Sequence, residues 1–324
     1  MHFPYKRLAI ASAATALLCV FSQAQAQTWP TKTVRFIVPF SPGGANDLMA
    51  RAAAEGAGKV LGQTVIVENR GGAGGSLGAD IVAKSTPDGY TFLISAAGVI
   101  SNSMIKKSLP FKDDDLVPVV MIGVAPSVIV VPKSAPYNNL LEFVEASKKG
   151  QGFNFATAGT GSTPHFVAEI LNVKYGAKLQ PVPYKSGSES TTAVLSKQVE
   201  GTSEASIIAL PHIRGDGRFK PLATTWTQRI SAYPQLSTAV EQGFPDLQIA
   251  HWAGLHAPRG TPPEIMDKLA AAVDKAMHDQ ANMDKLSRLG IEPVGGTRQE
   301  FVAFVDAERK RLGEIVKAAQ MKEE

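Results

Sequence analysis

Apolar segments of strand length alternate with helical patterns along most of the chain. Residues 34–40 (VRFIVPF) have the pattern of a strand and precede a helical pattern at 45–61 (ANDLMARAAAEGAGKVL). The same order recurs, with strands expected at 63–69, 90–95, 126–132, 153–159 and 179–184 and helices at 76–85, 162–175 and 186–198. The continuous β-branched run at 126–132 (PSVIVVP) is typical of a strand buried on both faces. This repeated strand–turn–helix order predicts an α/β fold with mainly parallel sheets.

The C-terminal part is expected to be helical. Helical patterns at 261–279 and 298–320 each place apolar residues on one stripe, which indicates core-facing helices. Two further segments, 126–136 and 247–262, are candidates for crossings between two lobes. If both cross, the chain divides into a first lobe and a second lobe. The division expected is a first lobe of residues 27–130 plus 254–324, and a second lobe of residues 131–253.

The first 26 residues have the three parts of a secretory signal. Lys6 and Arg7 precede the apolar run 8–21, and Ala24 and Ala26 supply the small residues of a cleavage site. A membrane anchor needs about 20 apolar residues, more than this run offers. We therefore expect cleavage after Ala26 and export to the periplasm.

Cysteine usage and charge exclude several classes of function. The chain has a single cysteine, Cys19, inside the expected signal, and the bulky Leu18 before it disfavours a lipoprotein attachment site. Removal of the signal excludes disulfides, thiolate metal sites and cysteine nucleophiles. It also removes Lys6 and Arg7, so the formal net charge falls by two from +4. With no long basic run, nucleic acid is not an expected partner.

Three glycine- and hydroxyl-rich turns follow predicted strands and precede predicted helices. Such turns gather at one edge of a parallel sheet, where ligands bind. The first N–H groups of a helix are unpaired, and glycine lets an anion approach them closely. Tight-turn and capping chemistry is the alternative interpretation. The residues concerned are Phe40, Ser41, Gly43 and Gly44 in the first turn, Thr160, Gly161 and Ser162 in the second, and Ser186, Gly187 and Ser188 in the third.

Other constellations are weaker. The glycines at 71–78 do not have the spacing of a dinucleotide fingerprint, and no Walker motif occurs, so this stretch is interpreted as structural. His251 and His256 are expected on opposite faces of an extended segment, which disfavours a shared metal. No metal or cofactor is expected. A secreted α/β hydrolase-like enzyme using Ser162 or Ser188 with His165 stays open as an alternative, although no G-x-S-x-G elbow occurs.

The chain resembles the Bug-type periplasmic solute-binding proteins of tripartite tricarboxylate transporters. The resemblance covers nearly all of the mature chain and is carried by the order of several motifs. These are VPFSPGGANDLMAR, VENRGGAGGSLGADIVAKSTPDGYT, GTGSTPHFVAEIL, VPYKSGSES, LPHIRGDGRFKPLATT and WAGLHAPRGTPPEIMDKL. It implies a two-lobed, type II-like periplasmic-binding fold with two crossover strands and a ligand cleft between the lobes.

The resemblance also implies which residues hold the ligand. To the three turns it adds Asp47 beside the first, His165 beside the second, and Ser95 and Ala96 from the first lobe. Many members of the family carry Asp where this chain has Glu204, and many read YKG where this chain has Ser186 before Gly187. Both departures fall where the distal end of a ligand is expected, so they bear on which ligand is bound.

The function expected is therefore capture of a small organic carboxylate and its delivery to the membrane subunits of a tripartite tricarboxylate transporter. Candidate ligands are di- and tricarboxylates, acidic amino acids and aromatic carboxylates such as a phthalate. A non-enzymatic monomer is expected. Besides the hydrolase-like enzyme, a ligand-dependent sensory partner of a receptor remains an alternative.

Overall fold

A computed structural model describes residues 29–184, 186–215 and 217–322. The expected signal peptide (1–26), including Cys19, lies outside the described residues. Within them, every strand and helix predicted from the apolar pattern has a counterpart. The largest difference is the strand predicted at 126–132, which begins at Leu116. The sequence pattern missed this start because glycine and prolines interrupt the apolar run.

The elements alternate between strand and helix over most of the chain. The strands are β1 (Val34–Val38), β2 (Val65–Asn69), β3 (Thr91–Ser95), β4 (Leu116–Pro132), β5 (Phe153–Thr157), β6 (Leu179–Pro183), β7 (Gly201–Ala205), β8 (Phe219–Thr224), β9 (Ala250–Pro258) and β10 (Glu292–Pro293). The α-helices are α2 (Ala45–Leu61), α3 (Ser76–Ala83), α4 (Ala97–Ile105), α5 (Leu140–Ser147), α6 (Thr163–Tyr175), α7 (Gly187–Leu195), α8 (Ser206–Arg214), α9 (Pro263–Met277), α10 (Gln280–Arg288) and α11 (Arg298–Ala318). Short 3₁₀ turns are η2 (Ala73–Gly75), η3 (Asp113–Asp115) and η4 (Val240–Gln242).

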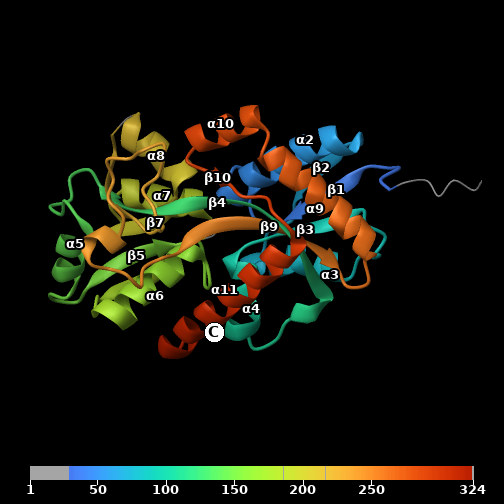
Figure 1. Cartoon of the computed structure of the whole chain (residues 1–324). Helices are drawn as coiled ribbons and strands as arrows, with labels where there is room; N and C mark the ends of the chain where they lie inside the picture. Colours follow the sequence, from blue (N-terminus) through green and yellow to red (C-terminus); the bar gives the residue numbers. More distant parts are fainter. Residues whose placement is uncertain (1–28, 185, 216, 323–324) are drawn as a thin grey trace, which may run out of the picture.

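Two groups of parallel strands are joined by two long antiparallel strands. In the first group β1 pairs with β2 and β3, and in the second β5 pairs with β6 and β7. Between them β9 pairs with β3 and with β4, and β4 pairs with β7, so the order is β2-β1-β3-β9-β4-β7-β5-β6. Figure 1 shows β4 and β9 running from one group to the other. The two-lobed α/β architecture with two crossover strands is therefore confirmed. We call the part around β1 the first lobe and the part around β5 the second lobe.

Each lobe has its own buried cluster, and α11 packs across both. Phe36 and Leu269 belong to a cluster formed by β1, β3, α2 and α9. Phe155 and Phe166 belong to a second cluster, which also contains Leu312 of α11. The helix α11 lies against α4 of the first lobe and α6 of the second (Figure 1). The apolar stripe of this C-terminal helix thus packs into the core against both lobes, as its pattern predicts.

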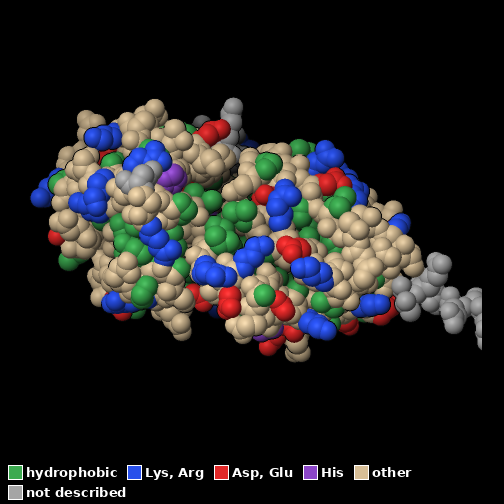
Figure 2. All heavy atoms as spheres, turned by 90° about the horizontal axis from the view of Figure 1, so that it is seen from above, with side chains coloured by type: hydrophobic (Ala, Val, Ile, Leu, Met, Phe, Trp, Pro, Cys, Tyr) green, Lys and Arg blue, Asp and Glu red, His purple; other side chains and the backbone are tan. Residues whose placement is uncertain are grey.

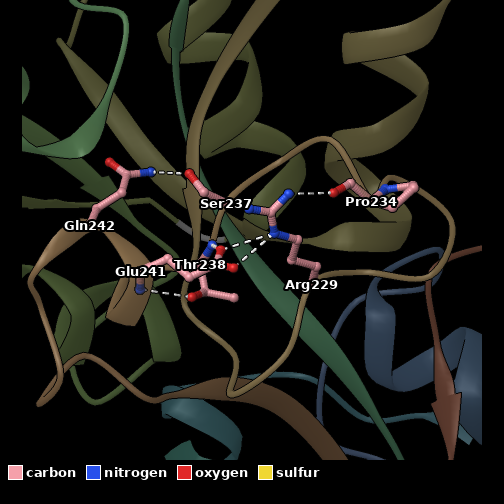
Figure 3. A network of polar contacts seen from close by, with 6 residues as sticks. All are labelled: Arg229, Pro234, Ser237, Thr238, Glu241 and Gln242. Atoms are coloured by element: carbon pink, nitrogen blue, oxygen red, sulfur yellow. Dashed lines mark hydrogen bonds and ion pairs between the residues drawn. The ribbon is translucent and has the colours of Figure 1, made fainter.

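Polar contacts hold the long connection between β8 and β9. Arg229 Nε lies 3.0 Å from both carboxylate oxygens of Glu241, and Arg229 Nη1 donates to the Pro234 carbonyl at 3.1 Å. Glu241 Oε2 also accepts from the Thr238 N–H at 2.7 Å (Figure 3). These contacts hold the connection between β8 and β9 in place. On the outer face shown in Figure 2, basic and acidic side chains are interspersed, as expected from the small net charge.

Candidate functional site

A cleft of about 780 Å³ lies between the two lobes, at the carboxyl ends of the parallel strands. Helix starts surround it, because each parallel strand turns into a helix at this edge. Most residues predicted for the site line this cleft. They are Phe40, Ser41, Gly44, Ala96, Thr160, Ser162, Ser186, Gly187, Ser188 and Glu204. The five predicted residues that do not line it are Gly43, Asp47, Ser95, Gly161 and His165.

Three helix starts that face the cleft have no side-chain cap, two of them at predicted turns and one at Ala96. Gly44 precedes α2, Ala96 precedes α4 and Ser162 precedes α6, and none of them accepts a side-chain hydrogen bond from its helix. The Ser162 hydroxyl instead donates to the Gly159 carbonyl at 2.6 Å. Unpaired first-turn N–H groups and the helix dipole make such starts attractive to anions. At α7 the capping interpretation holds, because Ser186 Oγ accepts from the Glu189 N–H at 3.3 Å.

Asp47 supports the first turn from behind. This residue is 2% exposed, and its Oδ2 accepts from the Gly43 N–H at 2.9 Å. Arg51 and Asn69 also contact this carboxylate, at 3.0 Å and 2.9 Å. Burial raises the pKa of Asp47, but the hydrogen bonds from Arg51, Gly43 and Asn69 outweigh it and leave this pKa below its ordinary value. Asp47 and Gly43 therefore shape the turn without facing the cleft.

His165 plays the same part in the second turn. Its Nδ1 accepts from the Gly161 N–H at 3.1 Å, and Gly161 has a φ of +78°, which favours glycine. The Gly161 carbonyl in turn accepts from Ser101 Oγ of α4 at 3.3 Å. Since Ser162 donates to Gly159 and His165 receives from Gly161, the Ser162 form of the hydrolase alternative has both of its groups engaged with the loop backbone. This geometry gives no support to a serine–histidine pair.

Ser95 lies beneath the cleft rather than in it. It is fully buried, with Oγ 2.7 Å from His256 Nδ1 and 3.1 Å from the Gly254 carbonyl, so it ties β3 to β9. Burial lowers the pKa of His256 to about 3, with the Arg309 charge contributing, so this imidazole is neutral. The next residue, Ala96, is the one that reaches the cleft from this strand end.

Two unpartnered polar groups face the cleft. Glu204, at the end of β7, is 3% exposed, and its Oε1 has no hydrogen-bond partner. Burial raises the pKa of Glu204 to about 8, so the carboxyl holds its proton at neutral pH. His251 Nε2 is also buried without a partner, and burial lowers the pKa of His251 to about 4 although a hydrogen bond with the Ser203 backbone raises it in part. Both groups are therefore uncharged in the free protein.

Several cleft residues were missed by the sequence analysis. His251 was considered only as a metal ligand, yet it is the crossing strand β9 that brings it to the cleft. Asn46 also lines the cleft and donates to the Trp252 carbonyl at 2.9 Å. The glycines at 71–75 were interpreted as structural, but they form part of the cleft lining. Gly72, Gly74 and Gly75 have positive φ angles and shape this turn, a feature that a motif search for nucleotide sites overlooks.

Charged side chains are scarce around the cleft. Of the described residues that line it, Glu204 is the one acid and none is Lys or Arg. Within the same part of the chain, no group of three or more His, Cys, Asp or Glu residues has the arrangement of a metal site. No helix there is long and apolar enough to cross a membrane. What the cleft offers a ligand is main-chain N–H groups, hydroxyls and two neutral titratable side chains.

The family model described as "Tripartite tricarboxylate transporter family receptor" matches residues 49–321. The chain belongs to this family. It is 36% identical to a UPF0065 protein of Bordetella pertussis, over 94% of each chain. It is 32% identical to the protein BugT of the same organism, over 96% of each chain. It is also similar to the solved structure of an R. palustris protein with adipate, with 30% identity, a TM-score of 0.85 and coverage of 91% of this chain and 99% of that one.

Membership of this receptor family confirms the resemblance inferred from the motifs, and the structural similarity confirms the two-lobed periplasmic-binding-protein fold. The family is one of solute-binding proteins, so the hydrolase-like alternative is not favoured. What the chain binds is a separate question, which the geometry of its own cleft addresses.

Proposed function

We propose that this receptor binds a small organic carboxylate in the cleft between its lobes. The observation that carries the proposal is the set of uncapped helix starts of α2, α4 and α6 around one cavity. A carboxylate placed there accepts hydrogen bonds from main-chain N–H groups, which replace water without any basic side chain. The adipate held by the similar R. palustris protein supports a ligand of this class.

The two lobes, residues 27–130 plus 254–324 and residues 131–253, close on the ligand by bending at β4 and β9. The site residues lie on both sides of this hinge: the first turn belongs to the first lobe, and the second and third turns to the second lobe. Closure brings the N–H groups of both lobes onto the same ligand and excludes water, which strengthens each charge-assisted contact. The turns anchored by Asp47 and His165 are pre-shaped for this, so little ordering is needed on binding.

In the cell the liganded protein acts in the periplasm as a non-enzymatic monomer. It presents the carboxylate to the membrane subunits of a tripartite tricarboxylate transporter, and needs no cofactor. A pull-down of those subunits that depends on ligand tests this delivery role against a sensory role. Hydrolysis of chromogenic esters that is lost in His165→Ala would contradict the non-enzymatic part of the proposal.

The binding proposal is tested by a thermal-shift screen over organic acids and their amides. A ligand present at 100 times its Kd adds about 2.7 kcal/mol to the free energy of unfolding. Acids are expected to stabilise the protein and fully amidated analogues are not, because an amide brings no negative charge to the helix starts. Equal stabilisation by acid and diamide would contradict an anion site.

A further inference from the structure

We propose that Glu204 and His251 form the distal recognition point of the cleft and select a ligand whose second end is a carboxamide, which offers an oxygen to Glu204 and an N–H group to His251, over one that ends in an ammonium group. This inference rests on the proposed function, because the uncapped helix starts hold the first carboxylate. It adds the chemistry of the other end, which those helix starts leave undefined.

The two side chains reach the same cleft from β7 and β9, the strands that pair with β4 on either side. Glu204 pairs with Val128 of β4, and His251 pairs with Ala125 of the same strand. The imidazole of His251 lies against the backbone of Ser203, the residue before Glu204. Both line the cleft. The crossing of β4 and β9 thus places a carboxyl and an imidazole together at the base of the ligand site.

Each side chain has a buried polar atom without a partner. Glu204 Oε1 and His251 Nε2 are inaccessible to solvent, and neither makes a hydrogen bond. A buried polar group left unpaired costs about 1–3 kcal/mol, so such groups are uncommon unless a ligand completes them. Two unpaired groups in one cleft indicate a position where a ligand supplies the missing donor and acceptor atoms.

The helix start next to Glu204 leaves room for its carboxyl. A Cβ built on Gly187 lies 2.7 Å from Glu204 Oε2 and 3.3 Å from Oε1, closer than packed atoms come. The carboxyl therefore occupies space that any other residue at the start of α7 would fill. This packing holds the carboxyl at the cleft and limits its rotation.

The charge of the pair determines which ligand end it suits. No other acid and no Lys or Arg is found among the described residues that line the cleft, which Glu204 shares with the His251 imidazole and the Tyr184 hydroxyl. Burial keeps Glu204 protonated and His251 neutral at neutral pH. A protonated carboxyl donates a hydrogen bond to a ligand oxygen directly. An ammonium group has no acceptor for the Glu204 O–H, so that donor stays unpaired unless Glu204 releases its proton.

The experiment compares four series of probes that share one carboxylate. They are straight-chain diacids of four to six carbons, their monoamides, the ω-amino acids of the same lengths and the simple monoacids. Affinities are measured by isothermal titration calorimetry for the wild type, Glu204→Gln, Glu204→Ala and Glu200→Gln. Gln keeps the size and the donor of a protonated Glu but cannot ionise, and Glu200 is a matched control before the same strand that does not line the cleft.

We expect monoamides to bind at least tenfold more tightly than diacids, ω-amino acids and monoacids, and tighter binding of diacids than of monoamides would overturn the inference. Glu204→Gln should change the preferred affinity less than threefold, and Glu204→Ala should weaken it at least tenfold. Tighter binding of ω-amino acids, lost in Glu204→Gln, would overturn the inference. So would binding that is insensitive to both changes at Glu204. Failure of all four series, which share the first carboxylate, would instead overturn the proposed function.

Calorimetric titrations of the wild type with its preferred probe, in two buffers with different protonation enthalpies, give an independent readout. A protonated donor predicts the same observed enthalpy in both buffers, because no proton is exchanged. Release of close to one proton on binding would show that Glu204 ionises against a cationic ligand end, and would contradict the inference. This measurement needs only the unaltered protein, so it does not depend on whether Glu204→Ala folds.

Discussion

The Glu204 carboxyl fills the space beside Gly187 at the start of α7, and a Cβ at position 187 would lie 2.7 Å from Glu204 Oε2. The third turn, at the start of α7, and the buried Glu204 side chain of β7 therefore pack as one structural unit. A change on either side of this contact has to be accommodated by the other, because the carboxyl is 3% exposed and cannot simply move into solvent.

Gly187→Ala is expected to lower the free energy of unfolding by about 1–3 kcal/mol, the usual cost of overpacking a buried contact. Glu204→Ala removes the obstructing atoms, so Gly187→Ala should cost little in that background. Urea denaturation of the wild type, both single variants and the double variant measures this coupling. Equal effects of Gly187→Ala in both backgrounds would contradict the contact.

Asp47→Asn tests the support of the first turn. The buried carboxylate receives hydrogen bonds from Gly43, Arg51 and Asn69, so loss of its charge should lower the free energy of unfolding by about 1–3 kcal/mol. Glu55→Gln is a matched control on the same helix, because Glu55 pairs with Lys59 at the same four-residue spacing but is exposed. That change should stay within about 0.5 kcal/mol.

The affinity for a carboxylate should also differ between Asp47→Asn and Glu55→Gln. Asp47→Asn loosens the Gly43 turn and should weaken carboxylate binding, as measured by calorimetry, whereas Glu55→Gln should leave it unchanged. Similar effects of both variants on stability would show that the Asp47 contacts are no stronger than a surface ion pair.

The fold could be predicted from the sequence because its signals are local. Most parallel strands are short apolar runs with glycine in the turn that follows, as at residues 153–159, and the longer helices have a repeating apolar stripe. The extent of β4 was harder to predict, because Gly123 and Pro126 interrupt the apolar pattern within it. Gly123 lies at one of the register shifts of the β4–β9 pair, where local irregularity is accommodated.

The site was predicted in part. The turns at Gly44 and Ser162 could be located because a strand, a turn and a helix in succession imply a helix start at the ligand edge. The roles of Asp47 and His165 could not be read from the chain, since a side chain that faces the cleft and one that supports its turn from behind look alike in a sequence. His251 was not assigned to the site because its position depends on how two distant strands cross.

Stability should depend on pH through Glu204. The pKa of this carboxyl rises from 4.5 to about 8 on folding, so the folded protein binds a proton that the unfolded chain releases. Its contribution is complete below pH 4.5 and is lost as the pH rises through about 8. One group of this kind changes the free energy of unfolding by at most about 1.4 kcal/mol per pH unit.

Glu204→Gln should remove this pH dependence of the free energy of unfolding. Urea denaturation at several values between about pH 5 and about pH 8 gives the difference between variant and wild type, which is expected to grow steadily with pH. The difference isolates Glu204 from the other titrating groups, which both proteins share. A difference that stays constant over this range would mean that Glu204 is ionised in the folded protein.

Gly161 and Gly44 offer a matched pair for testing the two glycine turns. Gly161 has a φ of +78°, and a Cβ there would lie 2.7 Å from Ser101 Oγ, whereas the Cβ of an alanine at Gly44 meets nothing closer than the Ser41 carbonyl at 3.6 Å. Gly161→Ala should therefore lower the free energy of unfolding by about 1–3 kcal/mol, because it combines backbone strain with a clash. Gly44→Ala should change it by less than about 0.5 kcal/mol.

Ser101→Ala separates the two causes at Gly161. It removes the hydroxyl nearest to the new methyl group, so it should recover part of the steric loss. The contact with Ile105 Cδ1 at 3.0 Å and the backbone strain remain. Because Ser101 belongs to the first lobe and Gly161 to the second, this contact joins the two lobes. Calorimetry should therefore show weaker carboxylate binding in Gly161→Ala and partial recovery in the double variant, and unchanged affinity in Gly161→Ala would contradict a role for this contact in the liganded form.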